Sequence, residues 1–184
     1  MKRSRTRSII FAGLFLARAA IFAGVNVTDI GPEGGSFQSL VVDPQDPRTL
    51  YAGARNAGVF KSIDGAASWT YAGLSGFTVT SLAVDPQDSN TIYAATLFEN
   101  GDDVRSFGIF KSQDGGENWS AVNSGLPAEC LPTFAPTIDG QYPSTLYALT
   151  SCAGVFKSAN GGENWYAVNS GLPDRMCLDY MLEV

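Results

Sequence analysis

The sequence predicts an all-β fold: a partial β-propeller of three four-stranded blades with incomplete strands at both ends. A phrase of 17 residues occurs almost unchanged as Lys111–Pro127 and Lys157–Pro173. It belongs to a longer unit that is present three times, whose closing residues Trp69, Trp119 and Trp165 recur at intervals of 50 and 46 residues. Each unit contains four short β-type segments, and four antiparallel strands in about 40–50 residues are typical of a propeller blade. After residue 24 no segment shows sustained helical periodicity.

The four strands of each unit are expected in the same order. The first shows the alternating side-chain pattern of a strand, as in SLAVD (81–85). The second is rich in Thr, Tyr and apolar residues, as in TLYAG (49–53). The third reads GVFKS or GIFKS, and the fourth follows each Trp. Asp-Pro, Gly, and Asp-Gly or Asn-Gly between the strands are turn signals. The predicted organisation is a signal peptide at 1–24, an entering strand and link at 25–36, blade 1 at 37–76, blade 2 at 77–127, blade 3 at 128–173 and the start of an incomplete next blade at 174–184.

Three blades do not close a propeller, which needs at least about four. We therefore expect a fragment of a longer propeller, with self-association through open blade edges. Two alternatives stay open: several copies could assemble into a closed ring, or the blades could form an open, curved stack.

The N-terminal segment differs from the rest of the chain. Lys2, Arg3, Arg5 and Arg7 precede the apolar run 9–17, and small residues follow. This order is typical of a secretory signal peptide, so we expect a secreted, periplasmic or cell-surface protein that has no membrane contact once the signal is removed. The alternatives are an N-terminal membrane anchor or a disordered basic tail.

Charge and composition exclude several classes of function. Without residues 1–24 the chain holds seven basic and eighteen acidic residues, and a chain this acidic repels nucleic acid. It contains no histidine, which excludes Ser-His-Asp and Cys-His nucleophile systems and the usual histidine zinc sites within this sequence. We expect no cofactor and no metal.

A motif closes each unit. The pattern S-x-D-G-x-x-x-W at Ser62–Trp69 and Ser112–Trp119, and at Ser158–Trp165 with Asn160 in the Asp position, resembles the Asp-box, or BNR repeat. The wider phrase, from VDPQDP to GLP, resembles secreted bacterial Asp-box propellers, a group that is similar to sialidases, photosystem II assembly factors, sortilin and xyloglucan-cleaving glycoside hydrolases. The resemblance covers about residues 37–173.

The resemblance implies a fold more specifically than a function, because the same repeat serves hydrolases, receptors and assembly factors. We expect a non-enzymatic, exported binding or assembly module with a protein or carbohydrate partner that the sequence does not name. The alternative is a fragment of a carbohydrate-active glycoside hydrolase, of the xyloglucanase-like kind before the sialidase kind.

The motif residues are expected to shape a turn. An Asp side chain can accept hydrogen bonds from N–H groups across its own turn, and Asn can fill most of that role. An amide does not titrate, so the replacement of Asp114 by Asn160 argues against a general acid or base at this position. Each Trp is expected to pack between sheets. The predicted structural set is Ser62, Asp64, Trp69, Ser112, Asp114, Trp119, Ser158, Asn160 and Trp165.

Ligands of propellers usually bind the face that carries the loops between the second and third strands, near the axis. Blade 2 has an eight-residue insertion on this face, drawn from Leu97–Phe107. Converging arginines there could clamp a carboxylate, and acidic residues could serve glycoside hydrolysis, although neither pattern is complete. A solvated loop is the simplest interpretation, and a calcium site at Glu99–Asp103 matches no full motif. The candidate residues are Arg55, Glu99, Asp102, Asp103, Arg105 and Arg175.

The three cysteines are expected on the same face. In an exported protein Cys130 and Cys152 could form a disulfide, and Cys152 with Cys177 is nearly as plausible. Three reduced cysteines are the third alternative.

Overall fold

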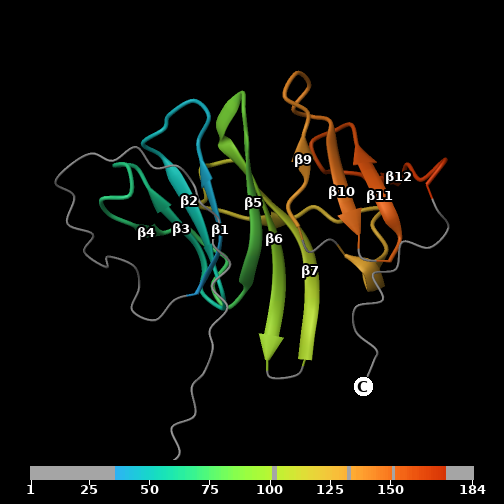
Figure 1. The fold of residues 1–184 in the computed structure, drawn as a ribbon, viewed down its shortest axis with the longest axis horizontal. Helices are drawn as coiled ribbons and strands as arrows, with labels where there is room; N and C mark the ends of the chain where they lie inside the picture. Colours follow the sequence, from blue (N-terminus) through green and yellow to red (C-terminus); the bar gives the residue numbers. More distant parts are fainter. Residues whose placement is uncertain (1–35, 101–102, 132–133, 151, 173–184) are drawn as a thin grey trace, which may run out of the picture.

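The structure is a computed structural model that describes residues 36–100, 103–131, 134–150 and 152–172. In these ranges twelve strands form three four-stranded antiparallel sheets, which stand side by side with the second sheet in the middle (Figure 1). The first sheet contains β1 (Phe37–Val42), β2 (Leu50–Ala54), β3 (Gly58–Ser62) and β4 (Thr70–Tyr71). The second sheet contains β5 (Thr78–Asp85), β6 (Asp88–Asn100), β7 (Asp103–Ser112) and β8 (Ser120–Ala121). The third sheet contains β9 (Thr137–Ile138), β10 (Leu146–Thr150), β11 (Gly154–Ser158) and β12 (Tyr166–Ala167).

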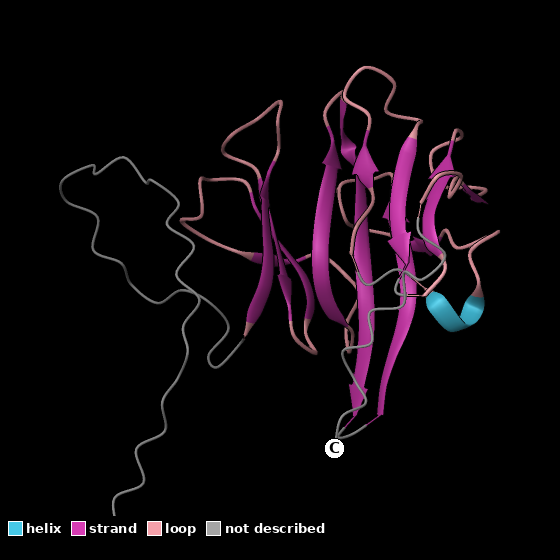
Figure 2. Cartoon of the chain, turned by 45° about the vertical axis from the view of Figure 1, so that its right-hand side comes forward, coloured by secondary structure: helices cyan, strands magenta, loops and turns pink. Residues whose placement is uncertain are grey.

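Within each sheet the strand order follows the chain, and the repeated sequence gives a repeated register. Strand β2 pairs with β3 from Leu50 opposite Ser62 onward, and β10 pairs with β11 from Leu146 opposite Ser158 onward. The predicted all-β class is therefore confirmed. Figure 2 shows the one helical turn of the described residues, a 3-10 turn at Ala128–Cys130.

The core lies between the sheets. Alternation along the central strand β6 sends Ile92 toward the first sheet and Tyr93 toward the third, and both side chains are buried. Tyr51 faces the second sheet from the first, and Leu146 faces it from the third. A fully buried aliphatic side chain such as Ile92 contributes about 1.5–3 kcal/mol, so these clusters fix the spacing of the sheets.

The structure differs from the sequence-based expectation in strand length. The fourth strands are only two residues long and follow the Trp positions, because the repeated turn ends just before them. The first strand of the third sheet is also only two residues long. The segments 1–24, 25–35 and 174–184, which carry the predicted signal peptide, most of the entering segment and the incomplete next blade, lie outside the described residues.

Within the described ranges, no helix has the length and apolar character that a membrane-spanning helix requires.

Candidate functional site

The repeated turn after β3 is built by a serine and an aspartate. The hydroxyl of Ser62 donates to Asp64 Oδ1 at 2.8 Å and accepts the N–H of Ala66 at 2.9 Å. Asp64 also accepts both the backbone N–H and the hydroxyl of Ser68, at 2.9 and 2.6 Å. Both oxygens of this carboxylate therefore accept hydrogen bonds from their own turn, which explains why a short side chain with an acceptor oxygen is found there.

The second sheet repeats this arrangement. Asp114 accepts the hydroxyl of Ser112 at 2.8 Å, and it accepts the backbone N–H and side-chain amide of Asn118 at 2.9 and 2.8 Å. In the third sheet Asn160 Oδ1 accepts the hydroxyl of Ser158 and the N–H of Asn164, at 2.9 and 3.0 Å. Asn160 thus keeps the bonds of one oxygen and loses those of the other, because an amide nitrogen cannot accept.

These hydrogen bonds hold the two acids in the ionised form. The side-chain and backbone hydrogen bonds from Ser68, with that from Ser62, lower the pKa of Asp64 to about 2. The backbone and side-chain hydrogen bonds from Asn118, with that from Ser112, lower the pKa of Asp114 to about 2. A general acid or base at neutral pH works best with a pKa near 7, so both acids are poorly suited to proton transfer.

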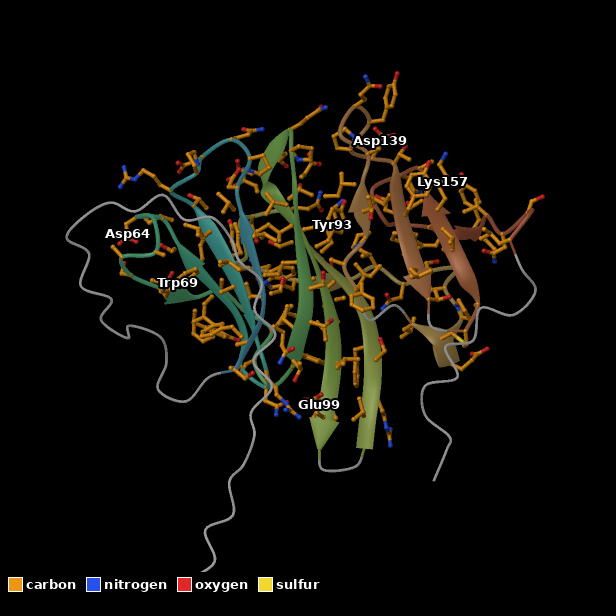
Figure 3. All side chains as sticks on the ribbon, viewed as in Figure 1. Asp64, Trp69, Tyr93, Glu99, Asp139 and Lys157 are labelled. Atoms are coloured by element: carbon orange, nitrogen blue, oxygen red, sulfur yellow. A yellow bond between two sulfur atoms is a disulfide. The ribbon has the colours of Figure 1, made fainter. Side chains whose placement is uncertain are left out.

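The opposite end of the sheets carries the feature that does not repeat. Figure 3 places Glu99 at the lower end of the molecule, away from the turns of Asp64 and Asp139. There the inserted residues extend β6 and β7 into a hairpin, which pairs Leu97 with Ser106 and Glu99 with Val104. The insertion is therefore mainly a strand extension, so these residues form paired strands where a solvated loop was expected.

A bulge at the base of this hairpin sets the direction of one side chain. Thr96 pairs with Gly108 and Leu97 pairs with Ser106, so Phe107 is the extra residue of β7. Its ring contacts those of Phe77 and Phe98, with centroids 5.3 and 6.3 Å apart. These rings join the hairpin to the link that enters the second sheet.

An ion pair ties the hairpin to the first sheet. Arg55 Nε lies 2.7 Å from Glu99 Oε2, and the two side chains are 56% and 19% exposed. The same oxygen accepts the buried hydroxyl of Thr78 at 3.2 Å. Two predicted site residues are thus brought together, but as partners of each other. An arginine that is already paired offers less charge to a ligand carboxylate, which disfavours the arginine clamp.

The structure describes the other predicted site residues only in part. Arg105 lies exposed on β7 opposite Phe98. The backbone of Asp103 begins β7, but its side chain is outside the description. Asp102 and Arg175 lie outside the described residues altogether. Among the side chains that the structure describes, no three His, Cys, Asp or Glu residues are grouped closely enough to hold a metal ion.

Sequence reasoning missed the apolar character of this end. Three hairpin residues, Phe98, Val104 and Phe107, are 37%, 55% and 42% exposed. The available signal was the run of β-prone residues on both sides of Gly101-Asp102, a pair typical of a two-residue hairpin turn.

Cys130 and Cys152 form a disulfide in the structure, with their Cα atoms 5.6 Å apart. The bond joins the 3-10 turn after the second sheet to the β10–β11 turn of the third sheet. Cys177, the partner in the alternative pairing, lies outside the described residues.

Comparison with solved structures decides the architecture. The chain is similar to an ancestral GH74 enzyme, with a TM-score of 0.59 and 24% identity over 72% of this chain and 18% of that one. It is also similar to the GH74 enzyme of Niastella koreensis, with a TM-score of 0.56 and 24% identity over 76% of this chain and 23% of that one. The fold is a partial β-propeller. Each sheet is one blade of it.

A third similar structure is that of YCF48 bound to D1 peptide, with a TM-score of 0.53 and 16% identity over 72% of this chain and 40% of that one. The chain thus spans less than half the length of each of these three proteins. No protein-family model and no curated protein sequence matches the chain. At these identities the similarity concerns the fold alone.

Proposed function

We propose that the chain is an exported, non-enzymatic binding or assembly module, and that its ligand surface is the outer part of the β6–β7 hairpin. One observation carries the proposal. The hairpin presents Phe98, Val104 and Phe107 to solvent, and ring contacts and the Arg55–Glu99 pair fix its position. The rings of Phe98 and Phe107 contact each other, and Val104, which pairs with Glu99, lies on the other face of the hairpin. Exposed apolar side chains on a rigid element favour binding, because desolvation stabilises a complex without ordering a flexible loop first.

The repeated turns support this assignment indirectly. We assign the Ser62–Trp69, Ser112–Trp119 and Ser158–Trp165 turns to the Asp-box (BNR) class. In the first two turns the carboxylates of Asp64 and Asp114 accept hydrogen bonds within the turn, and in the third the amide oxygen of Asn160 does so. The repeated acids thus serve the scaffold, and the hairpin that occurs once is the better candidate for function.

A partner that is a peptide or an extended protein segment fits this surface best. The hairpin ends as two long paired strands with apolar side chains, and one neighbour of the same fold, YCF48, was solved with a peptide bound. The second partner class that we propose is a carbohydrate, because aromatic side chains also stack on sugar rings.

Export is part of the proposal. It rests on the signal-like segment 1–24 and on the Cys130–Cys152 disulfide, since such bonds persist in oxidising compartments. Full-length protein expressed in a bacterial host should accumulate outside the cytoplasm with a new N-terminus between residues 21 and 25. Cytoplasmic protein that retains Met1 would contradict it.

The alternative function is a fragment of a xyloglucan-degrading hydrolase. It is supported by the similarity of fold to GH74 enzymes and by the acidic pair Asp102 and Asp103 at the hairpin end. Glycoside hydrolysis needs two carboxylates on either side of the bond. The one acidic side chain described on the hairpin, Glu99, is engaged with Arg55.

Selection against two libraries tests the binding surface. Immobilised wild-type protein would be screened with a random peptide library and with a plant-polysaccharide and sialoside array. We expect ligands that are retained by wild type and by Ile63→Ser, which changes an exposed apolar residue on the opposite end, but lost by Phe98→Ser/Val104→Ser. Equal retention by all three proteins, or no ligand in either library, contradicts the proposed surface.

A further inference from the structure

The two junctions between blades use one repeated set of contacts. At the first, the hydroxyl of Tyr51 and the ammonium of Lys61 donate to the carbonyl of Gly115, at 3.3 and 3.1 Å. Trp119 Nε1 returns a hydrogen bond to the carbonyl of Ala72 at 2.8 Å. The first blade therefore supplies a tyrosine, a lysine and one carbonyl, and the second supplies a tryptophan and a turn carbonyl.

The second junction repeats these contacts one blade further on. Tyr93 Oη and Lys111 Nζ both donate to the carbonyl of Gly161 at 3.1 Å. Trp165 Nε1 donates to the carbonyl of Val122 at 2.8 Å. We call the side of a blade that carries Tyr51, Tyr93 or Tyr147 its tyrosine face. The opposite side, next to Trp69, Trp119 or Trp165, is its tryptophan face.

The third blade has a complete tyrosine face with no blade against it in the described ranges. Lys157 Nζ lies 5.5 Å from the ring centre of Tyr147, as the equivalent lysines lie 5.3 and 5.5 Å from theirs. Val168 bonds to Val155 as Ala72 bonds to Val59. Yet Tyr147 is 38% exposed, where Tyr51 is fully buried. A hollow of about 350 Å³ lies beside it, lined by Phe134, Ala135, Thr137, Tyr147, Ala148, Leu149 and Val155.

The first blade, on the other side of the second blade, has a tryptophan face that no other blade covers in the described ranges. Gly65 has the left-handed conformation of Gly115 and Gly161, with φ of 74° against 72° and 68°, but it is exposed where they are buried. Leu40 is 62% exposed, whereas Leu82 at the same place in the second blade is 6% exposed. Within the described residues, no group accepts a hydrogen bond from Trp69 Nε1 or from Tyr147 Oη.

One end of the chain thus carries the donors of Tyr147 and Lys157 and the other carries their expected acceptor, the carbonyl of Gly65. We propose that two copies of this chain associate head to tail, with the tyrosine face of blade 3 in one copy against the tryptophan face of blade 1 in the other. Such an interface is heterologous, since it joins two different surfaces. The described blades of two copies number six, within the range of about four to eight with which propellers close, and the ring that such a pair would form has two identical junctions.

The new junction would differ from the internal ones near the axis. A Cβ on Gly53 would lie 2.7 Å from Val79 Cγ1, so blades one and two approach closely there. At the proposed junction the equivalent positions hold Leu149 and Phe37, which are 48% and 45% exposed. Two large side chains in place of a glycine and a valine make this junction wider at the axis, and they add apolar area to it.

Sedimentation equilibrium of the full chain tests the association. We expect a species of twice the chain mass. Tyr147→Glu and Leu40→Glu each place a charge in both junctions of a homodimer, so each variant alone should dissociate at least about 10-fold more readily. Tyr142→Glu, which changes a more exposed tyrosine outside both faces, should behave as wild type.

Mixing the two variants distinguishes this interface from any other. Tyr147→Glu keeps an intact tryptophan face and Leu40→Glu keeps an intact tyrosine face, so an equimolar mixture should recover a dimer held by one junction. Circular dichroism identical to wild type would show that each variant folds. A monomeric wild type, a ladder of species larger than a dimer, or a mixture that stays monomeric overturns the proposal.

Discussion

At the scale of single residues, the acids of the repeated turns act through hydrogen bonds that they accept. Asp64 and Asp114 are held ionised by donors of their own turns, and Asn160 takes the same place with fewer bonds. The change from Asp to Asn along the chain predicts a structural role, and the bonds that both residues accept lie within the turn. The backbone needs an acceptor at this point of the turn, and it does not need a charge.

The lowered pKa values give a pH dependence of stability. In the folded chain the pKa of Asp64 and of Asp114 is about 2, below the ordinary 3.8 of the unfolded chain. Their stabilising effect is thus complete above about pH 4 and is lost as the pH falls toward 2. Asp64→Asn/Asp114→Asn should show a smaller loss of urea midpoint between pH 5 and pH 2.5 than wild type. The same loss in both proteins would show that these carboxylates do not contribute.

One residue of the first turn is conformationally strained. Ala66 has a φ of 71°, and the second and third blades have Gly116 and Gly162 at this place, with φ of 98° and 91°. A residue that carries a Cβ is disfavoured in this region by about 1–2 kcal/mol. Glycine removes that strain, but its greater conformational freedom in the unfolded chain offsets part of the gain in stability. Ala66→Gly should therefore raise the free energy of unfolding by about 0.5–1 kcal/mol. Ala67→Gly, which changes a neighbour outside the left-handed region, should lower it; the opposite order in urea unfolding would refute this assignment.

At the scale of elements, the β6–β7 hairpin is an extension that Arg55 and Glu99 tie to the first blade. Because Arg55 is largely exposed, the pair is expected to contribute less than about 1 kcal/mol to global stability. Glu99→Ala should therefore leave the thermal midpoint nearly unchanged, while hydrogen exchange of the amides in 97–107 becomes faster. Glu117→Ala serves as the control at an exposed acid of a turn. Unchanged exchange in the hairpin of Glu99→Ala would mean that the rings alone hold it.

The Cys130–Cys152 disulfide also links separate elements, since it joins the turn after the second blade to the β10–β11 turn of the third blade. It closes a loop with a sequence separation of 22 residues, for which chain entropy suggests about 3 kcal/mol. Cys130→Ala/Cys152→Ala should lose roughly this much in urea unfolding, and Cys177→Ala should lose little. A larger loss in Cys177→Ala would support the alternative pairing with Cys152.

At the scale of the whole molecule, the repeat made the fold predictable. Three copies of one phrase required three similar sheets, and the alternation around Tyr51 and Tyr93 placed a core between them. The short fourth strands were not predictable, because their length depends on how far each pairs with the third strand of its sheet, which only the packed structure gives. The apolar hairpin was readable in principle from the residues that flank Gly101-Asp102. The Arg55–Glu99 pair was not, since it joins two blades whose relative position only the packed structure gives.

We propose that this partial propeller binds a partner and performs no hydrolysis. The most direct test is the release of reducing ends from xyloglucan by wild type, Glu99→Gln, Asp102→Asn and Asp103→Asn, with long incubation and a substrate blank. We predict no release above the blank by any of the four proteins. Turnover by wild type that is abolished in Asp102→Asn or Asp103→Asn would contradict the claim and assign the hairpin end to a glycoside hydrolase site.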